Sequence, residues 1–239
     1  MKPGQAAVEV SGLAAPLRAG GYEAFGAALV SVPWSATSGV RLRVGVQAGD
    51  HGGFGLRDSN LQVSHLLVNR PDLLLRGRLG ASLPLGTLGT TISVAPGASR
   101  SVDPTLGLDL VTGGTWLGVF GLEGRVPVYE GSDDVRQGAF GRLDARGARR
   151  VGGWAVPWAG LSVSTQAPSS LDSGDFVELA ATAGAMFNLA ERWGLSVQVR
   201  APVTGAPWPT PYAVAGGVGV SRVLGGGEAE EEHHDGDGH

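Results

Sequence analysis

Apolar and polar residues alternate along most of this chain, as the segment LSVQVR (195–200) illustrates. Period two is characteristic of a β-strand that has one apolar face and one polar face. Twelve segments of 9–14 residues have the composition of such strands: 5–13, 22–34, 39–49, 59–68, 73–84, 105–113, 115–128, 138–149, 152–165, 176–187, 193–203 and 212–224. Strands of ordinary globular proteins average about 5–6 residues, whereas strands that cross a membrane need about 9–11.

The links between these segments alternate in length. Short links follow 22–34, 59–68, 105–113, 138–149 and 176–187, and longer links lie at 14–21, 50–58, 85–104, 129–137, 166–175 and 204–211. Short turns at one end and long loops at the other are the arrangement of bacterial outer-membrane barrels. The pattern predicts an all-β, up-and-down antiparallel transmembrane β-barrel of about twelve strands over residues 1–224, with short periplasmic turns and longer extracellular loops.

The alternation sorts the strand residues onto two faces. One face is apolar and carries Val40, Leu42, Val44, Val46, Leu73, Leu75, Leu79, Leu83, Leu106, Leu108, Leu110, Trp116, Phe120, Leu122, Val126, Val177, Leu179 and Phe187. The other is polar and carries Arg41, Arg43, Gln47, Arg76, Arg78, Ser82, Asp109, Glu123, Arg125, Arg142, Asp144, Arg146, Glu178, Thr182 and Arg200. A soluble sandwich would bury the apolar face and expose the polar face to water.

Two observations favour the opposite arrangement, in which the apolar face lies in lipid. The polar face contains Gly45, Gly80, Gly107 and Gly121, as expected where a narrow lumen must fit neighbouring side chains. Strands of this length also lack an obvious second sheet to cover them. We therefore expect the apolar residues to point outward.

Composition narrows the function classes. Charged residues make up 17% of the chain, below the roughly 25% of soluble domains, and glycine is frequent, with 41 residues. The net charge of −4 and the absence of a basic stripe argue against nucleic-acid binding. Without cysteine there is no disulfide, thiolate metal site or cysteine nucleophile. No apolar run is long enough for a transmembrane helix. The start, MKPGQAAVEV, lacks a secretory signal, so we expect a mature chain from which the signal peptide has been removed.

Three segments resemble a known family: RPDLLLRGRLGASLPLG (70–86), ERWGLSVQVRAP (191–202) and YAVAGGVGVSRV (212–223). They look like Gram-negative outer-membrane barrels of the transporter type, among which the relatives of the phenol meta-pathway barrel proteins are the nearest. The resemblance is one of strand texture and spans about residues 20–224. It implies a β-barrel, location in the bacterial outer membrane and passage of small solutes, and it carries over no catalytic residue.

Charged side chains of the polar face are the first candidate site. Eight arginines are expected to point inward: Arg41, Arg43, Arg76, Arg78, Arg125, Arg142, Arg146 and Arg200. Six carboxylates face them: Glu9, Glu23, Asp109, Glu123, Asp144 and Glu178. Unpaired buried charge is costly, so structural pairing is one interpretation. The other is a constriction that selects anions through the surplus of positive charge.

The C-terminal tail is the second candidate site. The segment GGGEAEEEHHDGDGH (225–239) gathers carboxylates and three histidines after a glycine spacer. Imidazole binds Zn, Cu and Ni well, and carboxylates add oxygen ligands. We predict a flexible tail that binds metal through His233, His234, Asp235, Asp237 and His239. The alternative is an acidic, solvated terminus without a specific role.

Catalytic motifs are weak. Ser64 and His65 are adjacent, and some twelve-stranded outer-membrane lipases use a Ser and a His on the barrel wall. Alternation places His65 toward lipid and Ser64 toward the lumen, so the pair cannot cooperate simply, and no Asn or Asp that would orient the imidazole is evident. The glycine clusters in GLEGRV and GGVGVS are not followed by helices, which excludes a phosphate-binding loop. We predict that the protein is not an enzyme and requires no cofactor.

The sequence thus favours an outer-membrane barrel that provides a passive or gated route for small solutes, with lipid as its surroundings. Two alternatives remain open. One is a structural barrel whose lumen is plugged, and the other is a soluble secreted β-protein that binds metal through its tail. Substrate identity and oligomeric state are not indicated.

Overall fold

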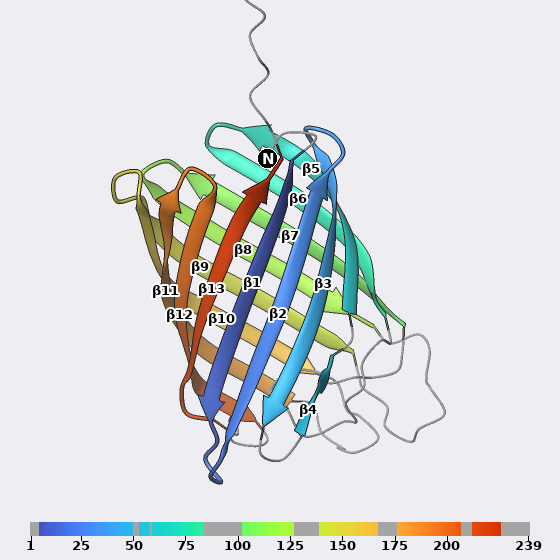
Figure 1. Ribbon diagram of the computed structural model, residues 1–239, viewed down its shortest axis with the longest axis vertical. Coiled ribbons are helices and arrows are strands. Elements are labelled where there is room, and N and C mark those ends of the chain that lie inside the picture. The colour runs from blue at the N-terminus through green and yellow to red at the C-terminus, as the bar shows by residue number, and fades with distance from the viewer. Residues whose placement is uncertain are drawn as a thin grey trace, which may run out of the picture.

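A closed β-barrel is the architecture of the chain in the computed structural model (Figure 1). The structure describes residues 5–49, 53–57, 59–83, 102–126, 139–166, 176–206 and 212–225. Thirteen strands lie in these ranges: β1 (Ala6–Pro16), β2 (Tyr22–Pro33), β3 (Ser38–Gly49), β4 (Gly53–Leu56), β5 (Ser59–Arg70), β6 (Leu73–Leu83), β7 (Asp103–Gly113), β8 (Trp116–Arg125), β9 (Phe140–Arg149), β10 (Ala155–Gln166), β11 (Phe176–Ala190), β12 (Trp193–Ala206) and β13 (Ala215–Leu224).

Every neighbouring pair in the sheet is antiparallel, and the sheet closes on itself. Strand β1 pairs with β2 on one side and with β13 on the other, so the two ends of the chain meet at one seam. Strands β4 and β5 share one position beside β3, because β5 pairs with residues 38–43 of β3 and β4 with residues 46–49. The wall therefore has twelve strand positions. The predicted all-β, twelve-stranded, up-and-down antiparallel barrel is confirmed.

Two of the predicted links were wrong. The segment 50–58 was expected to be a loop, but it contains β4, which extends the wall beside β3. The segment 14–21 was expected to be a long link, but β1 continues to Pro16 and a tight turn follows. In that turn the Leu17 amide donates to the carbonyl of Gly21, and the positive φ angles of Gly20 (93°) and Gly21 (84°) are conformations that glycine readily adopts.

The connection lengths still distinguish the two ends of the barrel. We call one the turn end, where the connections are 34–37, 71–72, 114–115, 150–154 and 191–192. The other is the loop end, which includes the connections 84–102, 126–139, 167–175 and 207–214. The N-terminus of β1 and the C-terminus of β13 both lie at the turn end (Figure 1).

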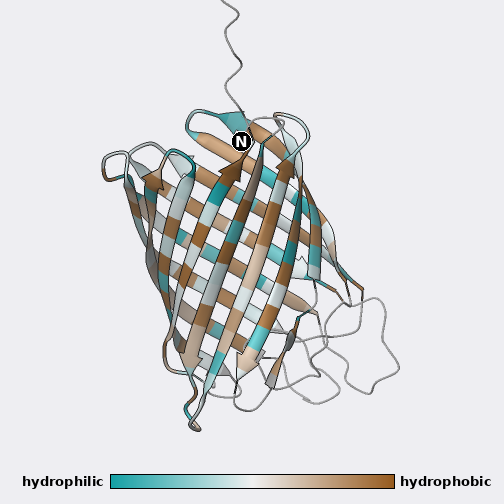
Figure 2. Cartoon of the chain, viewed as in Figure 1, coloured by the Kyte–Doolittle hydropathy of each residue, from teal (hydrophilic) through white to brown (hydrophobic). Residues whose placement is uncertain are grey.

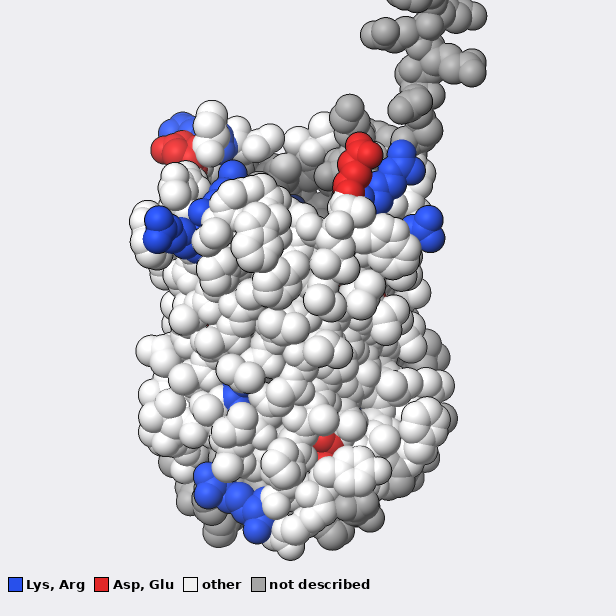
Figure 3. Space-filling view, turned by 60° about the vertical axis from the view of Figure 1, so that its left-hand side comes forward, with Lys and Arg blue, Asp and Glu red and all other residues white. Residues whose placement is uncertain are grey.

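The outer wall is apolar, as the alternation predicts. Large apolar side chains remain exposed on outward positions of the strands, including Leu79 and Leu106, each with 64% of its surface accessible. Brown and pale positions alternate along the strands in Figure 2, and Figure 3 shows a broad band with few charges between two charged rims. So large an exposed apolar surface is unfavourable in water and has the composition of a lipid-facing wall.

Tryptophans mark the turn end of this wall. Trp34, Trp116, Trp154 and Trp193 are all exposed there. The guanidinium carbons of Arg149 and Arg222 lie 5.2 and 4.8 Å from the ring centroids of Trp116 and Trp193. Amphipathic aromatic rings and long cationic side chains gather where hydrocarbon meets headgroups and water.

Strand length also fits a bilayer. The eleven residues of β1 cover about 29 Å along the barrel axis at a rise of about 3.4 Å and a tilt of about 40°. The hydrocarbon core of a bilayer is about 30 Å thick. Among the described residues, no helix is long and apolar enough to span a membrane.

Candidate functional site: the charged interior of the barrel

The inward positions of the strands carry the predicted charged set. Strand registers place every member of that set on the inner side of the wall: Glu9, Glu23, Arg41, Arg43, Arg76, Arg78, Asp109, Glu123, Arg125, Arg142, Asp144, Arg146, Glu178 and Arg200. Gln47 and Thr182 lie there as well and are buried. The barrel therefore brings together side chains that are spread over most of the chain.

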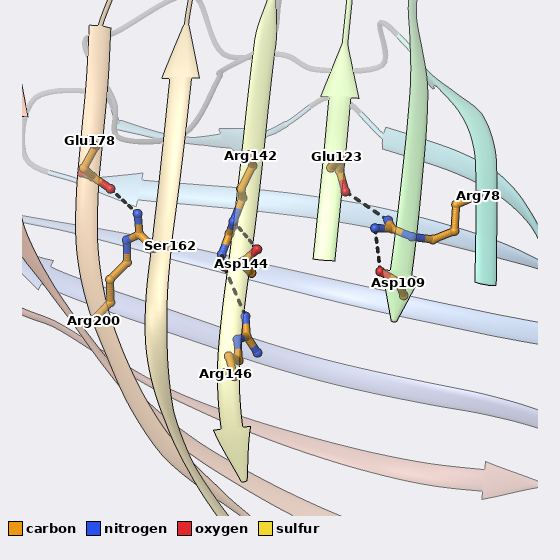
Figure 4. Close-up of polar contacts among 9 residues, drawn as sticks. All are labelled: Arg78, Asp109, Glu123, Arg142, Asp144, Arg146, Ser162, Glu178 and Arg200. Atoms are coloured by element: carbon orange, nitrogen blue, oxygen red, sulfur yellow. Dashed lines mark hydrogen bonds and ion pairs between the residues drawn. The ribbon is translucent and has the colours of Figure 1, made fainter. Parts of the chain in front are cut away.

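Arg78 is the centre of the first interior cluster. Its Nη2 lies 2.9 Å from Oδ1 of Asp109 on β7, and its Nη1 lies 3.0 Å from Oε2 of Glu123 on β8 (Figure 4). The guanidinium passes over Gly107, where an added Cβ would lie 2.8 Å from Arg78 Cζ. Glycine at this position therefore gives Arg78 the room to reach two carboxylates, and charge-assisted bonds of this kind are among the strong ones.

Asp144 holds the second cluster, on β9. Its Oδ2 lies 2.7 Å from Nε of Arg142, and its Oδ1 lies 3.6 Å from Nη2 of Arg146 (Figure 4). The Arg146 guanidinium also stacks over the Trp158 ring, 4.7 Å from its centroid. Trp158 lies across Gly184, where an added Cβ would come within 2.7 Å of the indole.

Arg200 on β12 organises the third cluster. It forms a close ion pair with Glu178 and donates hydrogen bonds to Ser162 Oγ (2.6 Å) and Tyr212 Oη (3.0 Å). Glu178 and Tyr212 are buried, with 2% and 1% of their surfaces accessible. Burial raises the pKa of the Tyr212 phenol, so this group stays neutral at physiological pH.

Arg41, Arg43 and Arg76 differ from these arginines. Within the described part of the chain, none of the three forms a hydrogen bond or an ion pair. Arg76 lies opposite Asp109 in the register of β6 and β7, but Asp109 binds Arg78 instead. Arg41 is half-buried, is repelled by the nearby Arg76 and Arg78, and is attracted by Asp109 and Glu9 without a direct bond to either.

Burial differs among the inward side chains of the barrel. Inward side chains nearest the loop end are almost inaccessible, as Asp103 (0%) and Thr105 (2%) show. Glu123 and Arg142 lie level with Gly107, one inward position beyond Thr105, and keep 37% and 38% of their side-chain surfaces accessible. Accessibility therefore differs between neighbouring inward positions, and some charged side chains near the loop end remain open to solvent.

Sequence reasoning missed four interior residues. Oδ2 of Asp103 lies 3.4 Å from Nε of Arg125, but the predicted strand began only at residue 105. Arg57 lies over the Phe25 ring in a segment that was expected to be a loop. Tyr212 and Trp158 were not singled out, although Trp158 alternates with Gly160 and Ser162, which pair with Arg146 and Asp144, and this spacing places it inside.

His65 faces outward among Leu61 and Val63, as predicted, while Ser64 points inward. The imidazole has a different hydroxyl partner, because Nδ1 lies 2.7 Å from Oγ of Ser38 on β3. Among the described residues, no carboxylate contacts this imidazole. The hydrogen bond between His65 and Ser38 satisfies two polar groups on the apolar outer wall.

The predicted metal ligands His233, His234, Asp235, Asp237 and His239 lie outside the described residues. Elsewhere in the described ranges, no three His, Asp or Glu side chains are grouped so that they could hold a metal ion.

Comparison with known proteins identifies relatives of the fold only. No protein-family model matches the chain, and no curated protein matches it in sequence. Among solved structures, the COG4313 outer membrane channel from Pseudomonas putida F1 superposes with a TM-score of 0.74 over 94% of this chain and 97% of that one, at 11% identity. The NanC porin gives 0.57 over 92% and 99%, at 9% identity. The β domain of the Bordetella autotransporter BrkA gives 0.53 over 93% and 99%, at 16% identity. The barrel is the shared feature.

Proposed function

We propose that the protein is an outer-membrane channel that lets small solutes diffuse through its polar lumen. The observation that carries the proposal is the direction of the interior ion pairs. Each pair described above joins residues of one strand or of strands no more than two positions apart in the wall. These side chains therefore run along the wall, and none of the described pairs bridges opposite sides of the lumen.

The apolar wall and the tryptophans at the turn end support a location in a membrane, and the similarity in fold to outer-membrane channels and porins supports the outer membrane. In this orientation the turn end faces the periplasm and the loop end faces the outside. The fold alone does not distinguish a channel from an autotransporter domain, which has the same kind of barrel. The charged, solvent-accessible interior favours a channel.

The interior charge favours anions weakly. With Arg57 and Asp103 added to the predicted set, nine arginines and seven carboxylates line the described interior, which leaves two positive charges. Charge enclosed by low-dielectric walls acts on passing ions more strongly than charge on an open surface. We therefore expect small anions to pass more readily than small cations.

A plugged barrel is the second candidate, and the burial at the loop end is the observation that favours it. Asp103, Thr105 and Glu178 have no more than 2% of their surfaces accessible. If packing closes the lumen at this end, the protein is a structural barrel without conductance.

Planar-bilayer recording separates the two candidates. Full-length protein that has folded, as judged by heat-dependent mobility in gel electrophoresis, is reconstituted and held under an applied voltage in potassium chloride. We expect discrete current steps. A folded, inserted protein that never conducts would refute the channel and favour the plugged barrel.

A further inference from the structure

Four arginines form a row along the inner wall of β3, β5 and β6. In the register of these strands, Arg43 lies level with Asn60 and Ser82, and Arg41 lies level with Gln62 and Gly80. Arg78 and Arg76 occupy the next two inward positions of β6 toward the turn end. Each step is two residues, or about 7 Å. We call Arg43, Arg41, Arg78 and Arg76 the arginine row.

Only one member of the arginine row is neutralised by direct bonds. Arg78 binds Asp109 and Glu123, whereas Arg43, Arg41 and Arg76 bind no carboxylate within the described residues. Arg43 is exposed and the other two are half-buried, so their guanidiniums remain accessible from the lumen. A guanidinium presents paired N–H donors that match a carboxylate. The three free members are therefore suited to a transient anionic ligand.

Apolar residues lie beside the turn-end member of the row. Leu66 on β5 pairs with Arg76, and one position farther toward the turn end Leu74 pairs with Val111, which in turn pairs with Val119 on β8. All four are inward-facing and half-buried. We call Leu66, Leu74, Val111 and Val119 the inner apolar patch. An apolar surface therefore lies next to a guanidinium that no described carboxylate binds directly.

We propose that the arginine row and the inner apolar patch together bind small organic carboxylates with an apolar body. At Arg76 the guanidinium pairs with the carboxylate while Val111 and its neighbours contact the hydrocarbon part, and Arg41 and Arg43 offer further guanidiniums along the wall. This inference rests on the proposed function, because it names the class of solute that the channel favours. Each contact is weak enough to be broken, as conduction requires.

Block of the chloride current by two probes tests this proposal. Potassium butanoate and potassium acetate carry the same charged group, but butanoate has two more methylene groups. We expect butanoate to halve the current of the full-length protein at a concentration about fivefold lower than acetate, since partial burial of two methylenes contributes an effect of that order.

Two variants with the same change in charge locate the site. Arg76→Gln removes a free guanidinium, and we expect the half-blocking concentration of both probes to rise about tenfold. Arg142→Gln removes a guanidinium that is paired with Asp144, which keeps Arg146 as a partner. Arg142→Gln should change neither concentration more than about twofold. Val111→Thr keeps the shape of the side chain and should weaken the block by butanoate only.

Equal block of wild type and Arg76→Gln would overturn the proposal, as would equal block by the two probes in wild type. The same comparison by ligand-observed NMR, with butanoate and the protein in lipid nanodiscs, does not depend on current. Binding without conductance would refute the proposed channel and keep the carboxylate site. Conductance without binding would refute the site and keep the channel.

Discussion

The two faces of β7 follow different physical rules. Leu106 and Leu108 point outward and are exposed, while Asp103 and Asp109 point inward and bind arginines of neighbouring strands. The outer face depends on its medium, because any sufficiently apolar side chain suits lipid. The inner face depends on specific partners, because a charge there is stable only if another side chain or water compensates it. The effect of a substitution on stability should therefore depend on the surrounding lipid on the outer face and on the pairing partner on the inner face.

The largest expected effect is on the outer face. Leu108 lies midway along β7, so Leu108→Arg should destabilise the inserted barrel by about 2–4 kcal/mol if this position lies at the bilayer midplane. Asp109→Asn on the adjacent inner position should cost less, because Arg78 keeps Glu123. Urea-dependent folding into liposomes measures both. Equal loss for the two variants would contradict the assignment of the faces.

On the inner face, the loss of stability that follows the removal of an arginine should depend on whether that arginine is paired. Arg200→Gln leaves the buried Glu178 carboxylate without its cation, which should destabilise the barrel by about 3 kcal/mol. Arg43→Gln removes an arginine that is exposed and pairs with none of the described residues, and should change the free energy of unfolding by no more than about 0.5 kcal/mol. The same liposome-folding assay compares them. A similar cost for both would show that pairing does not determine stability here.

Ion selectivity should depend more on the unpaired arginines than on the paired ones, which is the opposite of the order expected for stability. An unpaired arginine acts on passing ions with its full charge, whereas the charge of a paired arginine is offset by its carboxylate. Under a potassium chloride gradient, we expect the wild type to show a small reversal potential in the direction of anion preference. The double variant Arg41→Glu/Arg76→Glu should reverse its sign. Cation preference in the wild type would contradict the assignment of the interior charge.

The smallest expected effect on the barrel comes from the C-terminal tail, residues 225–239, which belongs to neither face of a strand. We predict that His233, His234 and His239, with Asp235 and Asp237, bind Zn, Cu or Ni, and that the affinity falls as pH drops through the range in which imidazole is protonated. Calorimetry compares the full chain with a version that ends at Leu224. Identical titrations would leave the tail as an acidic terminus.

The strands and their faces could be predicted from the sequence, because period two is a local property of the backbone. All twelve predicted segments overlap strands of the barrel, and the outward position of His65 followed from the same alternation. Errors occurred where the pattern is interrupted. Strand β4 was missed because the wall beside β3 is broken near Arg57, and the predicted strand began too late to include Asp103.

Which charges pair was decided only by the tertiary structure. The sequence places eight arginines and six carboxylates on one face, but it does not distinguish Arg78, which binds Glu123 from two strand positions away, from Arg76, which binds neither carboxylate nearby. That difference arises from the stagger between strands and from the space over Gly107, through which the Arg78 guanidinium passes. Alternation is set by each strand alone, whereas pairing requires the registers of several strands at once, and those registers exist only in the closed barrel.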